Sequence, residues 1–568
     1  NIITDTSNTE NPDNSKSSIV NRIRIPLSNV LRKSTAKDPE AALASMETLE
    51  DKLEVTNDGM ENVKLDNDVD EGKVATKLPL KERIRQRNFI IDDLVVCVLV
   101  VLVLLLVVIG VMVVALAGPP TSRPLRAGKY VVSLTGCGEV EGILEDGVYN
   151  FYGIPYAVPP VNEKRFTYAR RLDNISMCWN GTFKAHYPAP LCKQFLENST
   201  IIGQEDCLTI DVVTPHLRYD SPIPVVVLIG ANTLAGGIGP LQPSALYART
   251  KEVIFVRPNF RLGAFGFLAL DILSKDKYPE TSGNYGLSDL LVALEWIHYN
   301  IKHFGGDPEL VTLFGHRAGA TLTAALTTVR KAKKLYSRAW LSSPSVVYPG
   351  EPLDRGQSKN DQFKHTSKCS TVECLRAMSE FEVMSAIPDT WLGEEPALPR
   401  SGEQQRSWLV RDGVFIRAHA YEEWDQRNKR QPMVFGTTIR SSHEHKLMLR
   451  HANWTVNNVE SAVSDSVLGN LTELWNHYEK SFSGLAELTS AIRVVCPLVS
   501  LARMRLNAPL YIAGGADNHA GVGADVRAIL GTLDSDTPEQ RRFMSAMQQL
   551  FYEFVWHGRL SAYYCAIK

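Results

Sequence analysis

The sequence lacks several features that would assign it to common functional classes. Its 61 basic and 63 acidic residues leave a formal net charge of −2, which gives no electrostatic reason to expect a nucleic-acid partner. It contains no Cys-x-x-Cys pair and no cluster of histidines, the spacings from which metal sites are usually built. We therefore expect no metal, no cofactor and no nucleic acid.

Residues 1–93 are short of the residue types that build a core. They contain one aromatic residue, Phe89, and no Trp, Tyr or Cys. Such a segment buries too little apolar surface to offset the entropy lost on ordering, so we predict that it is disordered. Its charges form blocks, basic over 16–37, acidic over 38–71 and basic over 73–87. The tail is either simply solvated or recruits cytoplasmic partners that the sequence does not identify. Because the chain begins with Asn1 rather than Met, we expect the protein's N-terminus to lie further upstream.

A long uncharged run follows this tail. Residues 94–117 carry no charge, and 24 residues span roughly 36 Å as a helix at about 1.5 Å per residue. The hydrocarbon core of a bilayer is about 30 Å thick, so the run predicts a transmembrane helix in contact with lipid. It is too long, and lies too far from the first residue, to be a cleavable signal peptide.

Two asymmetries orient the predicted helix. Basic residues are more numerous before it than after it, which places the N-terminus in the cytoplasm. Eight of the nine cysteines and all five Asn-x-Ser/Thr acceptors follow it, and both disulfides and N-linked glycans belong to the lumenal side. The sequence predicts a single-pass type II protein of the plasma membrane with a cytoplasmic tail (1–93), a membrane helix (94–117) and an extracellular domain (118–568). The predicted glycosylation sites are Asn174, Asn180, Asn198, Asn453 and Asn470.

Strand-like and helix-like segments alternate in the extracellular domain. The runs at 224–230, 252–260 and 310–315 are typical of buried strands in a parallel sheet. Apolar residues at helical spacing predict a helix over 287–301, and a second helix-like run covers 318–329. This alternation predicts an α/β, doubly wound architecture.

The stretch VTLFGHRAGA (311–320) lies at one of these strand-to-helix turns. Its frame is that of a nucleophile elbow, Gly-x-Ser-x-Gly, in which a sharp turn exposes a serine at the end of a strand. Both glycines are present, but Arg317 stands where the serine belongs. We expect the turn to persist as an element of the fold, with Arg317 either paired inside the former site or exposed to solvent.

Several segments resemble the carboxylesterase/cholinesterase family of α/β-hydrolases. They occur in the family's order at 151–166, 205–215, 259–268, 283–315 and 496–504, and the resemblance covers nearly all of residues 128–560. It implies an α/β-hydrolase fold for the extracellular domain. It also implies positions for a serine, a histidine and an acid, with backbone N–H groups that bind the oxyanion.

The three triad positions hold residues that cannot perform this chemistry. Arg317 occupies the nucleophile position, and its guanidinium is protonated at physiological pH and has no lone pair for attack. Ser441 occupies the position of the acid and Val522 that of the histidine. Neighbouring residues that could be put forward as substitutes are His316, Glu444 and His519.

The oxyanion loop of the family is also altered. Consecutive glycines follow a central strand in the family, whereas this chain has Ala231, Asn232, Thr233 and Leu234 after Gly230. Side chains there restrict the backbone angles that glycine allows, which leaves the N–H of Ala318 as a remaining donor. Loss of the nucleophile or the base alone costs a serine hydrolase about 10⁶ in rate, so we predict that the chain is not an ester hydrolase.

The resemblance also implies disulfides. The family's bonds map onto three pairs and leave two cysteines as a fourth pair, while the loop closed by the first bond is short for the family and implies a reduced gorge. The implied pairs are Cys192–Cys207, Cys369–Cys374, Cys496–Cys565 and, as the remaining pair, Cys137–Cys178.

Members without a triad form a branch of cholinesterase-like adhesion molecules. The resemblance implies heterophilic adhesion at neuronal surfaces to a secreted or cell-surface protein with immunoglobulin domains, and roles in axon growth and guidance. Two alternatives stay open: a membrane-anchored ester hydrolase that uses atypical residues, and a receptor that keeps a gorge for a small ligand.

Overall fold

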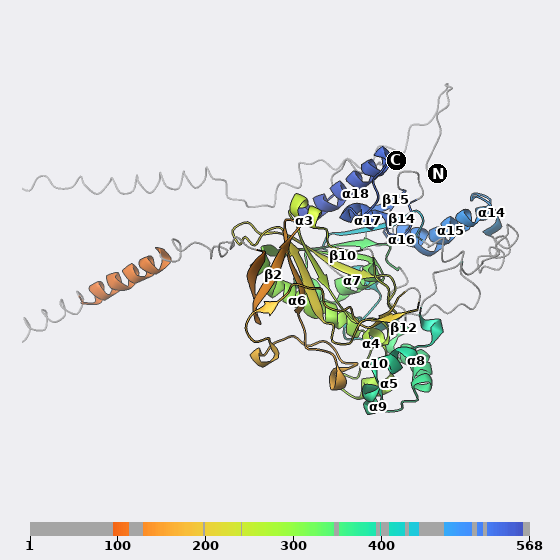
Figure 1. Cartoon of the computed structure of the whole chain (residues 1–568), viewed down its shortest axis with the longest axis horizontal. Helices are drawn as coiled ribbons and strands as arrows, with labels where there is room; N and C mark the ends of the chain where they lie inside the picture. Colours follow the sequence, from red (N-terminus) through yellow and green to blue (C-terminus); the bar gives the residue numbers. More distant parts are fainter. Residues whose placement is uncertain are drawn as a thin grey trace, which may run out of the picture. The chain divides into compact units, whose positions relative to one another are not determined.

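The computed structural model describes residues 95–112, 129–196, 199–239, 241–345, 351–392, 398, 408–425, 431–441, 471–502, 508–514 and 520–560. The chain divides into two compact units, Asn1–Leu105 and Leu106–Lys568. Val95–Met112 forms an apolar helix of 18 residues whose side chains are all exposed, and its length and composition make it a candidate membrane span (Figure 1, orange). A second apolar segment, Ser483–Leu501, meets the same criteria but is partly buried within the domain. Residues 94 and 113–117 of the predicted membrane helix, and the tail 1–93 that we predict to be disordered, lie outside the described residues.

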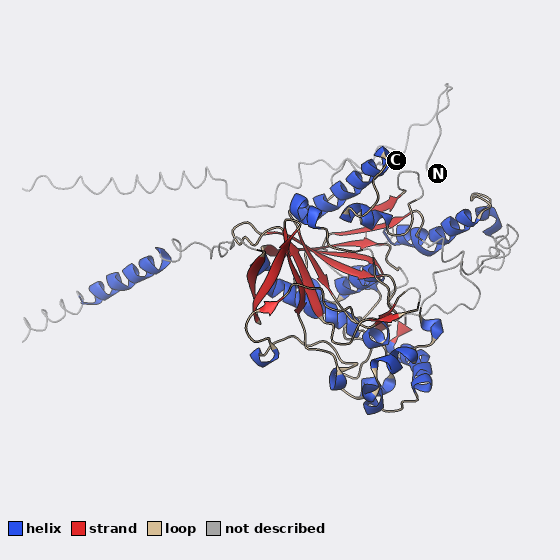
Figure 2. Ribbon diagram, in the orientation of Figure 1, coloured by secondary structure: helices blue, strands red, loops and turns tan. Residues whose placement is uncertain are grey.

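An eleven-stranded mixed sheet forms the centre of the domain (Figure 2). Its strands are β1 (Tyr130–Thr135), β2 (Gly138–Glu145), β3 (Val148–Pro155), β4 (Phe183–Lys184), β7 (Thr209–Thr214), β8 (Ile223–Ala231), β9 (Ile254–Pro258), β10 (Gly306–Arg317), β11 (Arg338–Ser342), β14 (Met433–Thr438) and β15 (Leu510–Ala513). The order is β1-β2-β3-β7-β9-β8-β10-β11-β14-β15, with β4 beside β2. Two short pairs lie apart from it, β5 (Gln194–Phe195) with β6 (Ile201–Ile202) and β12 (Glu351–Pro352) with β13 (Val410–Arg411).

The sheet is parallel in one half and antiparallel in the other. All neighbours from β9 through β15 are parallel, which confirms the strands predicted at 224–230, 252–260 and 310–315. The pairs β1–β2, β2–β3, β3–β7 and β7–β9 are antiparallel. The predicted α/β architecture is present, and its sheet is mixed.

Helices cover both faces of this sheet. The longer helices are α3 (Ala245–Lys251), α6 (Tyr285–Asn300), α7 (Ala318–Thr328), α8 (Leu353–Ser367), α15 (Phe482–Ser490), α17 (Ala524–Leu530) and α18 (Pro538–His557). The shorter ones are α4 (Gly263–Phe267), α5 (Asp271–Lys275), α9 (Val372–Ala377), α10 (Glu380–Ser385), α11 (Ala420–Asp425), α14 (Leu471–Trp475), α16 (Cys496–Leu501) and the single turns η2 (Asn162–Lys164), η3 (Ile175–Met177), η4 (Ile301–Phe304), η5 (Arg330–Lys334), η6 (Asp389–Trp391) and η7 (Ala491–Val495).

The two cores follow from the alternation of side chains along the strands. In β8, Val225 and Val227 pack on the face covered by α6 and α7, whereas Val226 and Leu228 pack on the face covered by α3, α17 and α18. A strand covered on both faces has to be apolar throughout, which is why β8 reads as a continuous hydrophobic run. The helices predicted at 287–301 and 318–329 are α6 and α7.

The last helix shows how local sequence fixes an element. Thr537 and Gln540 form a capping box, each accepting a hydrogen bond from the backbone N–H of the other, and Pro538 fills the first turn. Gly558 ends the helix in a left-handed conformation. Between these signals, α18 buries Phe551 and Val555 completely, and each such side chain contributes about 1.5–3 kcal/mol.

Three disulfides occur among the described residues, Cys137–Cys178, Cys192–Cys207 and Cys369–Cys374. The predicted Cys496–Cys565 bond is not among them. Cys496 carries a free, exposed thiol at the first residue of α16, and Cys565 lies outside the described residues. The Cys496–Cys565 pair therefore stays a prediction.

Candidate functional site

The elbow predicted at 311–320 is present. β10 ends at Arg317 and α7 begins at the next residue, with Arg317 held at φ 51° and ψ −118°. A positive φ is strained for any residue with a side chain, and it is the feature that gives a nucleophile elbow its sharp turn. A Cβ at Gly315 would overlap Thr323, and one at Gly319 would overlap the backbone oxygen of Ile229. The two glycines are therefore required by close packing of α7 against the sheet, which confirms the prediction that the turn persists.

Arg317 lies at the carboxyl end of the central strands. It stands beside Ala231 of β8 in the parallel register, its side chain is partly buried, and it takes part in an interaction. His316, the preceding residue, is buried within β10, where it stands beside Gly230 and Ser342 in the register. It is a residue of the sheet interior rather than of a loop that could deliver a base.

The altered oxyanion loop forms a tight turn that uses its own N–H groups. Asn232 donates its backbone N–H to the carbonyl of Gly237 at 3.2 Å, and Thr233 donates its own to the carbonyl of Gly236 at 3.0 Å. The Thr233 hydroxyl adds a second bond to the Gly236 carbonyl at 2.9 Å. An N–H group already paired in this way has no hydrogen left for an oxyanion.

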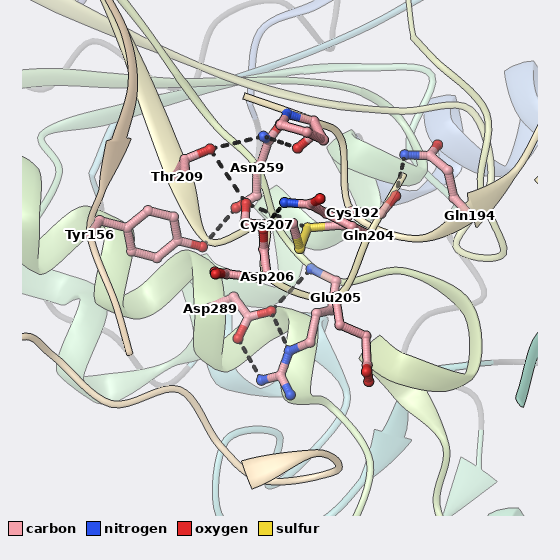
Figure 3. The surroundings of a disulfide bond; sticks show 12 residues. Tyr156, Cys192, Gln194, Gln204, Glu205, Asp206, Cys207, Thr209, Asn259 and Asp289 are labelled. Atoms are coloured by element: carbon pink, nitrogen blue, oxygen red, sulfur yellow. Dashed lines mark hydrogen bonds and ion pairs between the residues drawn. A yellow bond between two sulfur atoms is a disulfide. The ribbon is translucent and has the colours of Figure 1, made fainter. Parts of the chain in front are cut away.

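The loop closed by the Cys192–Cys207 disulfide, which Figure 3 shows, packs against this turn through Gln194 and Phe195. Gln194 accepts a hydrogen bond from the N–H of Gly237 at 3.1 Å and donates one to the carbonyl of Cys192 at 3.0 Å. Phe195 forms a bridge with Gly236, where a Cβ would overlap the Phe195 backbone. The disulfide therefore holds a short hairpin, β5–β6, that fixes the turn in its self-bonded form.

The acid position is part of a chain of neutral hydroxyl groups. Ser441 is buried, donates its hydroxyl to the carbonyl of Thr438 at 2.7 Å and lies 2.6 Å from the Thr437 hydroxyl. The Thr437 hydroxyl lies 3.0 Å from that of Ser343, which follows β11. Among the described residues, no carboxylate takes part in this chain of hydroxyl groups. Glu444, the suggested substitute, lies outside the described residues.

The histidine position is an apolar turn residue. Val522 precedes α17, is partly buried and accepts a hydrogen bond from Arg527 at 3.3 Å through its backbone carbonyl. His519, which could have been aligned with it, lies outside the described residues. Arg317 is the last residue of β10, and Ser441 and Val522 lie in the segments after β14 and β15, so all three come after the carboxyl ends of parallel strands or at them, where sites of α/β proteins are built.

A buried acid that the sequence analysis missed lies three residues beyond Val522. Asp525 is fully buried and accepts hydrogen bonds from Ser342 at 2.6 Å and from the Tyr511 hydroxyl at 2.7 Å, while Trp340 donates to Tyr511 at 3.2 Å. Burial raises the pKa of Asp525, and it raises the pKa of Tyr511 well above its ordinary value. The members of this network come from two strands, β11 and β15, and from helix α17, so no local sequence pattern predicts it.

Other features of the described residues bear on the remaining predictions. No group of three or more His, Cys, Asp or Glu side chains able to hold a metal ion occurs within the ranges given above. An open depression of about 450 Å³ lies between α3 and α18 and is lined by Lys251, Tyr552 and Trp556. It lies on the face of the sheet opposite to the face covered by α7.

Two of the predicted glycosylation sites, Asn174 and Asn180, are exposed. The other three predicted glycosylation sites, Asn198, Asn453 and Asn470, lie outside the described residues.

Comparison with known proteins shows which family the domain belongs to. The family model described as the carboxylesterase family matches residues 129–513. The chain is 44% identical to Neurotactin of Drosophila melanogaster over 592 residues, covering 96% of this chain and 70% of that protein. It is 36% identical to fumonisin B1 esterase of Sphingopyxis macrogoltabida, over 40% of this chain and 42% of that enzyme.

The fold is also that of a solved esterase. The structure named PNB esterase superimposes with a TM-score of 0.61 at 24% sequence identity, covering 76% of this chain and 91% of that one. At this identity the likeness concerns the fold. The proteins that this chain is similar to include both esterases and Neurotactin. Whether this chain has esterase activity therefore has to be judged from the residues of the elbow and around it.

Proposed function

This chain belongs to the carboxylesterase family, and we propose that it is a member that has lost ester hydrolysis and acts as a cell-surface adhesion receptor for an extracellular protein. The observation that carries the loss of catalysis is Arg317 at the strained position of the elbow. A permanently protonated guanidinium cannot attack a carbonyl carbon or be activated by a base.

The surroundings of Arg317 support the same conclusion independently. The hydroxyl chain at Ser441 has no charge with which to orient and stabilise an imidazolium, and Val522 has no proton to exchange. The N–H groups of Asn232 and Thr233 are bonded within their own turn. Each part of the machinery is missing for its own physical reason, so a single compensating residue would not restore it.

The proposed placement is that of a type II protein of the plasma membrane, with the domain outside the cell. Supporting it are the candidate span Val95–Met112, the three disulfides and the exposure of Asn174 and Asn180. Glycosylation is tested by expressing Asn174→Gln and Asn180→Gln in cells. Each is expected to lose one glycan-sized increment that glycosidase treatment removes from the wild type, and unchanged migration would contradict the placement.

The proposed activity is heterophilic adhesion. Similarity to Neurotactin over 96% of the chain supports it, as does the resemblance to the adhesion branch of the family. We propose that the partner is a secreted or cell-surface protein with immunoglobulin domains and that the contact serves axon growth and guidance. Cytoplasmic partners of the tail would respond to this contact.

Cell mixing tests the adhesion proposal. Cells that express the full chain are expected to remain dispersed among themselves and to aggregate when neuronal extracellular extract or candidate immunoglobulin-domain proteins are added. A matched variant that lacks residues 1–93 should aggregate equally, because the proposed contact lies in the extracellular domain. The proposal would be overturned if aggregation required residues 1–93, or if no neuronal extract or candidate protein caused aggregation.

A membrane-anchored hydrolase is the competing function, and it has a direct test. The full chain is incubated with acyl esters and with a fluorophosphonate that labels activated serines. We expect neither burst release nor covalent labelling. Labelling that is lost on heating the protein first would show an active serine and contradict the non-catalytic proposal.

A further inference from the structure

A cluster of basic residues forms one short turn at the end of α7. The five residues of η5, Arg330–Lys334, include four cations, and all four side chains are exposed. The remaining residue, Ala332, is fully buried. Neither the esterase chemistry nor the elbow explains a charge density of this kind on the surface.

The geometry of η5 arranges these cations in two rows. A 3-10 helix has three residues per turn and rises about 2 Å per residue, so side chains three positions apart lie one above the other. Arg330 and Lys333 form one row, Lys331 and Lys334 form the other, and Ala332 points into the core. The four charges lie along roughly 8–10 Å, about one Debye length at physiological ionic strength, so they act on an approaching ion together.

The turn is fixed to the domain rather than loosely attached. Ala332 and Leu335 donate backbone hydrogen bonds within the turn at 3.1 and 2.9 Å. The side chain of Gln431 donates to the carbonyls of Lys333 at 2.7 Å and of Tyr336 at 2.9 Å. A ligand would therefore meet a preorganised surface, which reduces the ordering cost of binding.

The cations are not used for ion pairs within the described part of the chain. None of the four forms a salt bridge there, although long basic side chains elsewhere in the domain do. A simpler explanation is that cations after α7 interact favourably with the negative, C-terminal end of its helix dipole. This effect contributes about 0.3–1 kcal/mol and falls off within one turn. That effect accounts for one or two cations and not for two complete rows.

The composition of the cluster discriminates among anionic partners. Its apolar neighbours Val329, Leu335 and Tyr336 are buried, so nothing is available to insert into a lipid surface or to stack on bases. Three of the four cations are lysines, which the cores of protein interfaces avoid in favour of arginine and aromatic residues. The cluster therefore suits a flexible, densely charged linear polymer better than the surface of a folded protein.

We propose that η5 binds a sulfated glycosaminoglycan, with its lysine and arginine side chains contacting successive sulfate groups. The choice of a polysaccharide over a nucleic acid rests on the proposed extracellular placement of the domain. The surface is separate from the former catalytic site, because α7 has 11 residues and therefore places about 16 Å between Arg317 and η5. Such a contact would hold the receptor at cell surfaces and matrices rich in sulfated chains.

Salt-dependent binding of the detergent-solubilised full chain to immobilised heparin oligosaccharides tests this proposal. The cluster variant replaces Arg330, Lys331, Lys333 and Lys334 with Gln. The control variant makes the same substitution at four exposed, dispersed cations and so changes the net charge equally. The control positions are Lys184, Lys302, Arg355 and Arg542.

The cluster variant is expected to bind at least about tenfold more weakly at physiological salt, and the control variant within about twofold of wild type. If each cation releases about 0.7 counterion, the slope of log affinity against log salt falls by about 3 in the cluster variant. Equal losses of heparin affinity in the cluster and control variants would show that binding depends on the overall charge of the domain, and would overturn the proposed site. Equal competition by single-stranded DNA or by unsulfated hyaluronan would overturn the assignment to sulfated sugars. Equal thermal midpoints of the variants exclude misfolding, and the readout does not depend on the adhesion partner.

Discussion

Rebuilding the triad on this domain should fail to produce an esterase. The perturbation is the triple substitution Arg317→Ser, Ser441→Glu and Val522→His, which supplies a nucleophile, an acid and a base at the family's positions. The elbow that would present the serine is intact, with φ 51° at residue 317, so the nucleophile itself would be well placed. The remaining obstacle is the turn at 232–237.

The size of this obstacle follows from two hydrogen bonds. The N–H groups of Asn232 and Thr233 are donated to Gly237 and Gly236 at 3.2 and 3.0 Å and are not available to a developing oxyanion. Loss of one oxyanion donor costs a serine hydrolase about 10²–10³ in kcat, so loss of two costs about 10⁴–10⁶, or about 5–8 kcal/mol. The triple variant is therefore expected to remain below detection in an ordinary ester assay.

The assay compares this variant with one that also carries Ala231→Gly, Asn232→Gly and Thr233→Gly. Hydrolysis of p-nitrophenyl acetate and fluorophosphonate labelling are measured on both full chains, with wild type as the blank. Only the variant with the glycines is expected to label. If the triple variant labelled and turned over as fast as the variant with the glycines, the turn would not limit catalysis and the reasoning would be refuted.

Three further predictions concern stability, each read from urea unfolding of the full chain in detergent. Arg317→Gly should be more stable than Arg317→Ala by about 1–2 kcal/mol, because glycine accepts the positive φ; the reverse order would show that the turn relaxes. Gly319→Ala should cost at least about 2 kcal/mol, because its Cβ would overlap Ile229, and an unchanged midpoint would mean that α7 shifts freely. Burial raises the pKa of Asp525, so the folded state holds this proton more tightly than the unfolded state. Wild type should therefore lose stability relative to Asp525→Asn as pH rises from about 4 through the raised pKa, and a difference that grew as pH fell would contradict this.

The elements that the sequence predicts best are those fixed by neighbouring residues. β10, the elbow and α7 follow from an apolar run, two glycines at fixed spacing and a helical pattern, all within residues 306–328. The positions of Arg317, Ser441 and Val522 followed from the family's order of motifs and not from periodicity. In the structure Arg317 ends β10, Ser441 follows β14 and Val522 lies in the segment after β15.

The features that the sequence left open depend on contacts between distant residues. Gln194 reaches Gly237 across 43 residues, and Ser342 reaches Asp525 across 183, so no local pattern could reveal either bond. The antiparallel pairing of β7 with β3 and β9 also depends on which distant strands become neighbours, and a local sequence pattern does not show this. The Cys496–Cys565 bond that the resemblance implies stays a prediction, because Cys565 lies outside the described residues.

The retained elbow explains how a hydrolase fold can lose its chemistry without losing its architecture. The strain at Arg317 costs about 1–3 kcal/mol and would be expected to relax once no serine needs presenting. It does not relax, because Gly319 brings the first turn of α7 against Ile229 of β8 and so fixes where the chain must reverse. The buried side chains of α7, among them Leu322 and Leu326, each contribute about as much as the strain costs. The turn is thus maintained by packing, while the side chain at its apex is free to change, and the same holds for the hydroxyl chain at Ser441. Under the proposed non-catalytic function, substitutions at the apex, at Ser441 and Val522 and in the oxyanion turn would remove catalysis and leave the scaffold available for binding.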